Sequence, residues 1–242
     1  MRDSESMRGR RQRLRVLLLL LAVVLLVPAA GLVLWPLTPS VADAEQRIES
    51  RLSRHTAADP RALPVPDRVG RAIIATEDSR FYAHHGLDLL GVLRAALGFS
   101  RGSADPGGAT LDQQLSKNLY TSNSLLAKVE QVELSFKLEA AYSKTQILEM
   151  YLSEVYFGEG HYGLAAAARG YFGVAPANLT WAQASLLAGL VQAPSAYDPL
   201  HHLDLAKKRQ RHVLDRLVAV GTLSAGDADA AFGRPLQFQP GR

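Results

Sequence analysis

The apolar positions of this chain follow two different patterns. Residues 16–34 form a leucine-rich run of 19 residues without a charge. As a helix rising 1.5 Å per residue, this run would span the ~30 Å hydrocarbon core of a bilayer. From residue 65 onward, apolar and polar positions instead recur with the spacing of amphipathic helices. The pattern predicts a mainly α-helical domain behind a single N-terminal transmembrane helix.

Local signals place several helix starts. Asp67 is the expected N-cap of a helix that runs to about Glu77. Three further starts fit the S/T-x-x-E/Q capping box: Thr110 with Gln113, Ser143 with Gln146, and Thr180 with Gln183. A stripe of apolar residues at 4-3-4-4 spacing predicts the buried face of a long helix: Leu125, Val129, Val132, Phe136 and Ala140. Strands are expected only as short segments near Tyr156 and at residues 236–238.

The excess positive charge lies at the N-terminus. Six arginines against two acids give residues 1–15 a charge of +4, which equals the formal net charge of the whole chain. The balanced remainder argues against a nucleic-acid-binding domain, which would carry its basic excess on the folded surface. Because arginines precede residues 16–34 and none follows closely, the N-terminus is expected in the cytoplasm and Trp35 at the outer membrane interface.

These signals divide the chain into four parts: a basic cytoplasmic tail (1–15), a transmembrane anchor (16–35), a connector with a short helical patch (36–64) and a folded domain (65–242). A cleaved signal peptide is the alternative for the apolar run, since residues 28–31 could form a cleavage site. The run is longer than the usual apolar region of a signal peptide, which favours an uncleaved anchor. The absence of cysteine excludes disulfides and thiolate metal sites.

Two polar segments carry the strongest functional signal. Residues 77–88 and 107–118 bring together a carboxylate pair, a histidine, two side-chain amides and a lysine. A packed core does not tolerate so many polar groups unpaired. The carboxylate pair, Glu77 and Asp78, would lie at a helix C-terminus, where the macrodipole disfavours acids. An isolated pair of this kind is usually solvated surface, but its combination with the second segment indicates a cleft.

Five blocks share one order with a known family. The first follows the pattern E-D-x-x-F-x-x-H-x-G through Glu77, Asp78, Phe81, His84 and Gly86, and residues 107–118 follow G-x-S-T-x-x-Q-Q-L-x-K-N at all but two positions. Residues 137–152, 156–173 and 179–195 supply the other three blocks. Together they resemble the glycosyltransferase domain of peptidoglycan polymerases, the family of the monofunctional transglycosylases and the N-terminal half of class A penicillin-binding proteins. The resemblance runs from about residue 65 to about residue 217.

The resemblance implies a lysozyme-like, mainly α fold and a glycosyltransferase that polymerises lipid II. Glu77 would be the general base, taking the proton from the 4-hydroxyl of the acceptor N-acetylglucosamine. That hydroxyl would attack the anomeric carbon of the donor's N-acetylmuramic acid with inversion and release undecaprenyl pyrophosphate. Candidates for binding the pyrophosphate are Lys117, Lys128, Lys137 and Arg94. Thr110, Gln113 and Gln114 would hydrogen-bond sugar and phosphate oxygens. The other substrate-binding candidates are Asp78, Phe81, His84, Asn118 and Gln131, and His84 would also brace the loop after Glu77.

The chain departs from the family pattern at several of these positions. Aligned without a gap, the family's R-K-x-x-E element falls on residues 127–131, so a phosphate-binding arginine becomes Ala127 and a second functional glutamate becomes Gln131. Gln131 can hydrogen-bond but cannot hold a proton or bind a divalent cation as a carboxylate does. Glu130 and Glu133 lie about 100° and 200° round the helix from Gln131, so they cannot simply replace it. Elsewhere, Ala109 replaces a serine, Asp112 a threonine and Ser153 an asparagine.

Three functions are consistent with this pattern. The first is a peptidoglycan glycosyltransferase anchored in the inner membrane with its catalytic domain outside the cytoplasm, monofunctional because the chain stops near Arg242. The second is a non-catalytic relative that binds lipid II or another cell-wall synthesis protein, as Ala127 and Gln131 suggest. The third is a lysozyme-like hydrolase or lytic transglycosylase, which would use Glu77 as an acid and which the Gln-Gln and lysine blocks do not suit.

Expected partners are lipid II, the nascent glycan strand, the membrane and other cell-wall synthesis proteins, and not nucleic acid. No tightly bound cofactor and no dedicated histidine metal site are expected, because adjacent histidines point to different faces of a helix or strand. The histidines considered are His84, His85, His161, His201 and His202. A hydrated Mg²⁺ or Mn²⁺ shared with the substrate pyrophosphate is the metal that this chemistry would use.

Overall fold

The computed structural model describes residues 35–55, 65–91, 109–120 and 127–239. Residues 40–242 form one compact unit, distinct from residues 1–39. Across the described ranges, no helix is both long enough and apolar enough to cross a bilayer. The anchor expected at residues 16–35 lies outside these ranges except for Trp35, so it stays a prediction.

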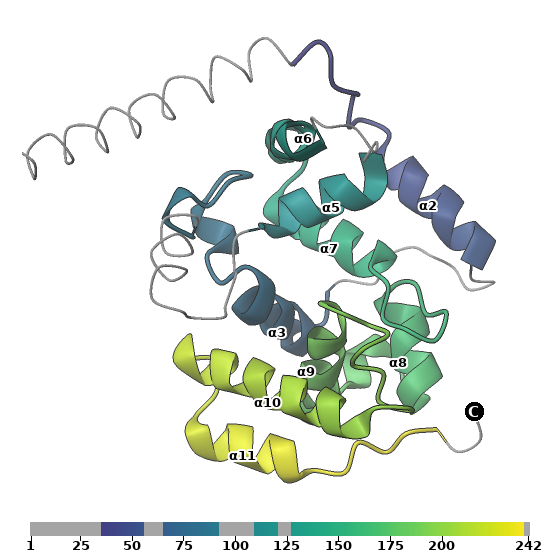
Figure 1. Cartoon of the computed structure of the whole chain (residues 1–242), viewed down its shortest axis with the longest axis vertical. Coiled ribbons are helices and arrows are strands. Elements are labelled where there is room, and N and C mark those ends of the chain that lie inside the picture. The colour runs from purple at the N-terminus through teal and green to yellow at the C-terminus, as the bar shows by residue number, and fades with distance from the viewer. Residues whose placement is uncertain (1–34, 56–64, 92–108, 121–126, 240–242) are drawn as a thin grey trace, which may run out of the picture. The chain divides into compact units, whose positions relative to one another are not determined.

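Helices form nearly all the regular structure of the described chain (Figure 1). The α-helices are α2 (Ala44–His55), α3 (Asp67–Glu77), α5 (Leu111–Tyr120), α6 (Ala127–Ala141), α7 (Lys144–Glu154), α8 (Leu164–Phe172), α9 (Trp181–Leu190), α10 (Leu203–Ala219) and α11 (Ala225–Gly233). Two 3₁₀ turns, η1 (Phe81–Ala83) and η2 (Pro176–Asn178), lie between them. The mainly α prediction is confirmed. Among the described residues, β-structure is limited to isolated bridges, one of them between Tyr156 and Tyr162, and residues 236–238 form no strand.

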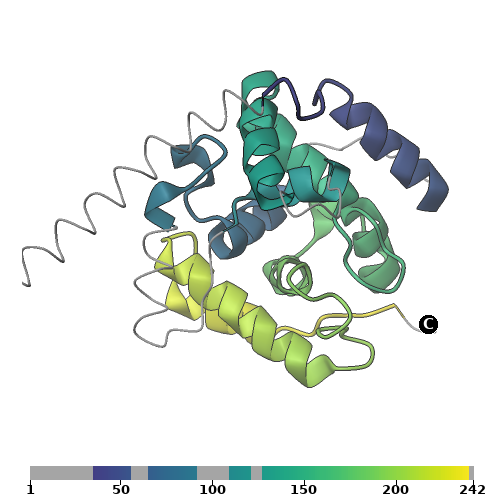
Figure 2. The same ribbon diagram turned by 45° about the horizontal axis from the view of Figure 1, so that its top comes forward.

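Helix α9 lies at the centre of the core. Residues 182–190 are all buried, because this helix carries small and apolar side chains on every side. Figures 1 and 2 show α3 and α9 between two groups of helices, with α10 and α11 on one side and α5, α6 and α7 on the other. The C-terminal end of α3, which carries Glu77, therefore lies where the two groups meet.

The predicted capping boxes are local features that the fold keeps. Complete boxes cap α7, through Ser143 and Gln146, and α9, through Thr180 and Gln183. At α5 the Thr110 hydroxyl accepts a hydrogen bond from the backbone N–H of Gln113 at 3.2 Å. Each such cap satisfies backbone donors that the first helical turn leaves unpaired.

The predicted N-cap of α3 is wrong by one position. Pro66 is the N-cap, with extended backbone and no side-chain hydrogen bond, and Asp67 is the first helical residue. The Asp67 carboxylate accepts a hydrogen bond from Arg71 Nε at 2.7 Å, one turn further along the helix. Asp67 therefore contributes a negative charge to the first turn, which the helix dipole favours.

The predicted buried face of α6 is also wrong. Leu125 lies outside the described residues. Val129 is 42% exposed, Ala140 is also exposed, and Val132 and Phe136 are only half-buried. The buried residues of α6 are Gln131, Glu133, Leu134, Ser135, Lys137 and Leu138. The prediction from apolar spacing is wrong because α6 packs on α5 through polar as well as apolar contacts. The Ser116 hydroxyl, for example, donates a hydrogen bond to the backbone carbonyl of Gln131 at 3.1 Å.

The segment expected as a connector contributes to the core. Its helical patch forms α2, and Ala44, Ile48 and Leu52 are buried in the main hydrophobic cluster. Arg51 of the same helix pairs with Glu154 of α7 at 3.3 Å. The hydrophobic core thus includes residues well before residue 65, where the folded domain was expected to begin.

Candidate active site

Glu77 is the last residue of α3, and hydrogen-bond donors from two other helices hold its carboxylate. Gln114 Nε2 of α5 donates to Oε2 at 3.3 Å, and Arg209 Nη2 of α10 donates to Oε1 at 3.4 Å. The Glu77 side chain is 13% exposed. Each carboxylate oxygen thus has a fixed donor, while part of the group stays accessible to a ligand.

A third helix sets the orientation of Gln114. The hydroxyl of Tyr151, on α7, donates to Gln114 Oε1 at 2.9 Å. Burial, together with the negative charges of Glu77 and Glu154, raises the pKa of Tyr151 well above its ordinary value, so the phenol keeps its proton. Because Tyr151 supplies a donor to Oε1, the amide N–H₂ of Gln114 faces Glu77.

The loop after Glu77 is tied to α5 through Asp78. The Asp78 carboxylate accepts a hydrogen bond from His84 Nε2 at 2.9 Å and another from the backbone N–H of Leu111 at 3.1 Å. Asp78, Phe81 and His84 are 7%, 0% and 6% exposed. All three were expected to bind substrate. In this conformation they are enclosed by protein and hold the loop, as was expected of His84.

Gly86 is the second anchor of this loop. Its carbonyl accepts hydrogen bonds from the hydroxyls of Thr110 at 2.9 Å and Ser135 at 3.0 Å, and its N–H donates to Glu139 at 3.0 Å. A Cβ here would lie 3.1 Å from the backbone of α6, and φ is +77°. Only glycine meets both requirements without strain, which explains the last position of the first motif.

A buried ion cluster lies under the same loop. Asp112, which replaces the family's threonine, is 0% exposed and lies 3.6 Å from Lys144 Nζ. Lys144 also pairs with Glu139 and lies 4.2 Å from the centre of the Phe81 ring. Burial raises the pKa of Asp112 from 3.8 to about 7, and Lys144 only partly opposes this effect.

The candidate phosphate-binding residues are distributed over α5 and α6: Lys117, Lys128, Gln131 and Lys137. We call this group the cation face, although Lys128 and Lys137 lie on opposite sides of α6. Lys117 and Lys128 are exposed, whereas Gln131 and Lys137 are buried. Burial lowers the pKa of Lys137, and the nearby Glu133 opposes this effect. Lys117 follows Gln114 by three residues, so it lies one turn further along α5 on the same side.

The other predicted site residues are distributed around these two groups. Thr110 and Gln113 are buried at the start of α5, where Thr110 serves as cap and loop anchor. The Asn118 side chain hydrogen-bonds Glu154. Arg94 lies outside the described residues.

Two groups of carboxylates and a histidine come close enough to resemble metal ligand sets. One consists of Asp78, His84 and Asp112, and the other of Glu159, Asp198 and His201. Lys144 already brings positive charge to the first group. In the second, His201 Nδ1 hydrogen-bonds the Asp198 carboxylate at 2.6 Å, which raises the pKa of His201.

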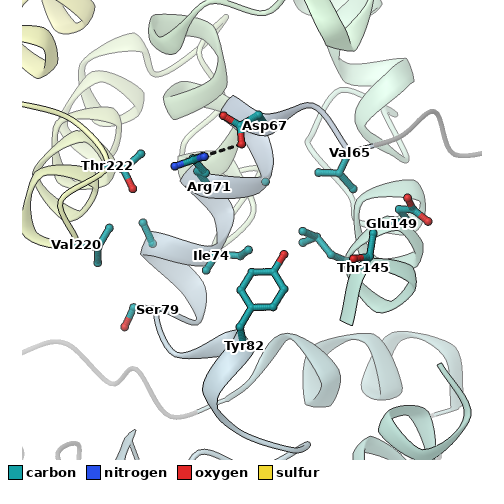
Figure 3. A pocket seen from close by; sticks show the side chains of 13 residues that line it. Val65, Asp67, Arg71, Ile74, Ser79, Tyr82, Thr145, Glu149, Val220 and Thr222 are labelled. Carbon is teal, nitrogen blue, oxygen red and sulfur yellow. Dashed lines mark hydrogen bonds and ion pairs between the residues drawn. The ribbon is translucent and has the colours of Figure 1, made fainter. Parts of the chain in front are cut away.

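A separate cavity of about 470 Å³ lies along α3. Figure 3 shows Tyr82 and Ile74 close together at this cavity, with the Asp67–Arg71 ion pair at its edge and Thr145 and Glu149 on the α7 side. Glu77, Gln114 and Arg209 are not among its lining residues. The cavity is therefore distinct from the Glu77 site.

The sequence pointed to Glu77 and Gln114 but gave no role to Tyr151 and Arg209, which contact them, or to Lys144, which lies under the loop after Glu77. Tyr151 and Lys144 belong to a matched block, and that block could have drawn attention to them. Arg209 lies in a basic stretch of α10, where nothing in the sequence distinguishes it from Lys208 or Arg211. Only the packing of α10 on α3 reveals its contact with Glu77.

Comparison with known proteins decides the family. A family model described as Transglycosylase matches residues 45–218. The chain belongs to this peptidoglycan glycosyltransferase family. Its enzyme class is that of the peptidoglycan transglycosylases. The match begins within α2, in agreement with the burial of that helix in the core.

Two similar proteins known from their sequences agree with the family match. A protein of Cupriavidus necator with the provisional name transglycosylase is 38% identical over 188 residues, covering 77% of this chain and 81% of that protein. Penicillin-binding protein 1A of Neisseria gonorrhoeae is 40% identical over 177 residues, covering 72% of this chain and 22% of that protein. This chain therefore spans about a fifth of the length of that penicillin-binding protein. A crystal structure of penicillin-binding protein 1A from Haemophilus influenzae aligns at 26% identity with a TM-score of 0.44, covering 74% of this chain and 18% of that one.

Proposed function

We propose that this protein polymerises lipid II into glycan strands, with Glu77 as the general base. Glu77 takes the proton from the 4-hydroxyl of the acceptor N-acetylglucosamine. The oxygen forms the glycosidic bond to the anomeric carbon of the donor's N-acetylmuramic acid, and undecaprenyl pyrophosphate leaves from the opposite side. The observation that carries this proposal is the Glu77 carboxylate, held by donors from α5 and α10 yet partly exposed.

The leaving pyrophosphate needs positive charge, which we assign to the cation face. Lys117 and Lys128 are exposed on α5 and α6, where they can reach phosphate oxygens. Mg²⁺ or Mn²⁺ would enter with the pyrophosphate and neutralise part of its charge. Gln131 would offer such an ion an amide oxygen but no carboxylate, so this chain relies more on its lysines than the family pattern does.

The decisive test is turnover of lipid II by Glu77→Gln. A positioned general base contributes about 10²-fold or more, so the variant should lose at least that factor in kcat. The matched control is Glu149→Gln, on α7 beside the separate cavity, which should polymerise at the wild-type rate. Polymerisation by a folded Glu77→Gln at the wild-type rate would exclude Glu77 as the base.

The proposal also includes a single N-terminal membrane anchor with the domain outside the cytoplasm. It rests on the apolar run at residues 16–34 and on the arginines before it. A reporter enzyme that works only outside the cytoplasm should be active when fused after Arg242. A reporter that works only in the cytoplasm should be inactive at the same position. Cytoplasmic activity of that fusion would contradict both this topology and the reaction, because the glycan strand is assembled outside.

A second candidate function is supported by Ala127 and Gln131. These residues remove one positive and one negative charge from the cation face, and a relative with both changes could bind lipid II without joining it. Turnover separates the two candidates, since a binding protein would retain lipid II and form no polymer.

A further inference from the structure

Helix α10 approaches α3 through two arginines on one of its sides. Arg209 and Arg216 are seven residues apart, close to two helical turns, so they point in nearly the same direction. Arg216 Nε donates to the backbone carbonyl of Ala75 at 3.2 Å. Arg209 Nη2 reaches the Glu77 carboxylate at 3.4 Å, 132 residues away in sequence. One arginine therefore contacts the backbone of α3 and the other its final side chain.

The surroundings of Arg209 show that its approach to Glu77 is closely packed. The side chain is 14% exposed, and its Nε is buried without a hydrogen-bond partner among the described residues. Gly189 of α9 provides room for its stem, since a Cβ there would lie 3.0 Å from Arg209 Cγ. Burying a guanidinium is unfavourable unless a counter-charge compensates it. Within the described structure, the carboxylate at ion-pair distance from Arg209 is that of Glu77.

Among the described residues, three helices bring charged or polar groups to the surroundings of Glu77. Arg209 of α10 brings the positive charge, Gln114 of α5 brings a neutral donor, and the protonated hydroxyl of Tyr151 on α7 lies behind Gln114. Glu154 lies beyond Tyr151, and its carboxylate forms an ion pair with Arg51. Both donors favour the charged form of Glu77, and Arg209 is the one of the two that also carries a positive charge.

We propose that Arg209 is a positioning residue for the transfer reaction: its guanidinium holds the Glu77 carboxylate ionised and in a fixed orientation toward the acceptor hydroxyl. This inference rests on the proposed function. The interaction makes Glu77 a weaker base but keeps it ionised over a wider pH range. Arg209 itself forms no contact with the reacting atoms in this scheme.

The first experiment measures lipid II polymerisation against pH for the full-length chain in detergent. Arg209→Met removes the charge and keeps much of the length of the side chain. It should lower kcat about tenfold, since misplacing a catalytic group by a fraction of an ångström to about 1 Å costs tenfold to a hundredfold. It should change KM little and move the rise of activity with pH to higher pH. Arg209→Lys keeps the charge. It should therefore retain part of the rate, and its activity should rise with pH over the same range as in the wild type, a rise that we call the pH limb.

The matched control is Arg216→Met. It removes the other arginine contact between α10 and α3 but leaves the Glu77 carboxylate untouched. This variant should lower the melting temperature without moving the pH limb. If Arg216→Met shifts the pH limb as far as Arg209→Met does, Arg209 acts only through helix packing and the proposal is wrong.

The second experiment is independent of turnover. The carboxyl carbon of Glu77 can be titrated by NMR in glutamate-labelled protein, with Glu77→Gln used to assign its signal. Arg209→Met should move this titration to higher pH, and Arg216→Met should leave it in place. An unmoved titration, or a moved titration with unchanged kcat, would overturn the proposal. Arg209→Gln is the second neutral variant if Arg209→Met does not fold.

The two experiments separate the inference from the function on which it rests. A wild-type protein that makes no polymer would overturn the proposed function and, with it, the role of Arg209 in positioning a base for transfer. The titration would still show whether Arg209 controls the ionisation of Glu77. A wild-type protein that polymerises normally, with an Arg209→Met variant equal to it in rate and pH profile, would overturn the inference alone.

Discussion

The Glu77 site and the cation face differ in how firmly the protein holds them. The carboxylate of Glu77 has a donor on each oxygen, and Tyr151 fixes one of those donors. On the cation face, Lys117 and Lys128 are exposed, and the family's arginine and second glutamate are Ala127 and Gln131. In the proposed reaction, a base must be oriented before the acceptor arrives, whereas long lysine side chains can adjust to a mobile pyrophosphate.

The difference suggests where the chain tolerates change. The loop after Glu77 depends on buried hydrogen bonds, and each group that lost its partner would cost about 1–3 kcal/mol. An exposed lysine or a missing arginine leaves no buried group unpaired, so the fold does not penalise it. The absence of an arginine at Ala127 is therefore compatible with stability. Gln131 is buried, and as a neutral amide it places no uncompensated charge in the interior.

The largest effect that would sharpen this comparison is expected on the cation face. Restoring the family residues with Ala127→Arg and Gln131→Glu together should raise polymerisation by about tenfold, because the pair lies one turn apart and supplies opposite charges to one phosphate-binding surface. Gln131→Glu alone adds an acid near phosphate without its balancing arginine, so the two changes should couple. The measurement is kcat on lipid II for both single variants and the double variant.

The outcomes of the restoration distinguish the two candidate functions. Polymer formed only by the double variant would make the natural protein a binding relative. If the wild type already polymerises rapidly and the double variant has the same kcat, the cation face works without these two charges. Their importance would then be smaller than we infer.

A smaller effect is expected from removing the hydroxyl of Tyr151, which contacts Gln114 and not Glu77 itself. Tyr151→Phe removes the donor that orients Gln114 and leaves Gln114 Oε1 without that partner. The loss of about 1 kcal/mol from one hydrogen bond corresponds to roughly a fivefold fall in kcat. Tyr142→Phe is the control, since its hydroxyl donates to the Val41 carbonyl, away from Glu77. Equal rates for wild type and Tyr151→Phe would show that Gln114 is oriented without Tyr151.

The smallest effect concerns stability beneath the Glu77 loop. Burial raises the pKa of Asp112 to about 7, against 3.8 ordinarily, and the neighbouring charges are Lys144, Glu139, His84 and Asp78. The native state therefore keeps the proton of Asp112 after the unfolded chain has released it, so this group destabilises the fold as pH rises from about 4 through about 7. Asp112→Asn removes the titration. The melting temperature of Asp112→Asn minus that of the wild type should therefore increase by a few degrees from about pH 5 to about pH 8.

Thermal unfolding followed by circular dichroism at several pH values checks this prediction. Asp215→Asn, at an exposed ion pair on α10, is the control, and its difference from wild type should stay nearly constant with pH. A constant difference for Asp112→Asn would mean that Lys144 keeps Asp112 ionised throughout the range.

The sequence by itself determined the features that depend on neighbours along the chain. Capping boxes at Ser143 and Thr180 and the place of Glu77 at a helix end follow from contacts within one turn, which is why they could be predicted. The family pattern also identified Glu77 and Gln114, but it could not show that they touch. The buried face of α6 was misjudged because apolar spacing ignores hydrogen bonds to other elements.

Only the tertiary structure decided which distant groups meet at Glu77. Arg209 comes from a helix 132 residues further along and resembles its basic neighbours in sequence. Gly189 of α9 leaves room for Arg209, so α10 packs closely against the buried helix α9, and both helices also contact α3. Which side chains meet across such an interface depends on the depth and angle of helix packing, and those follow from the whole core and not from any local stretch.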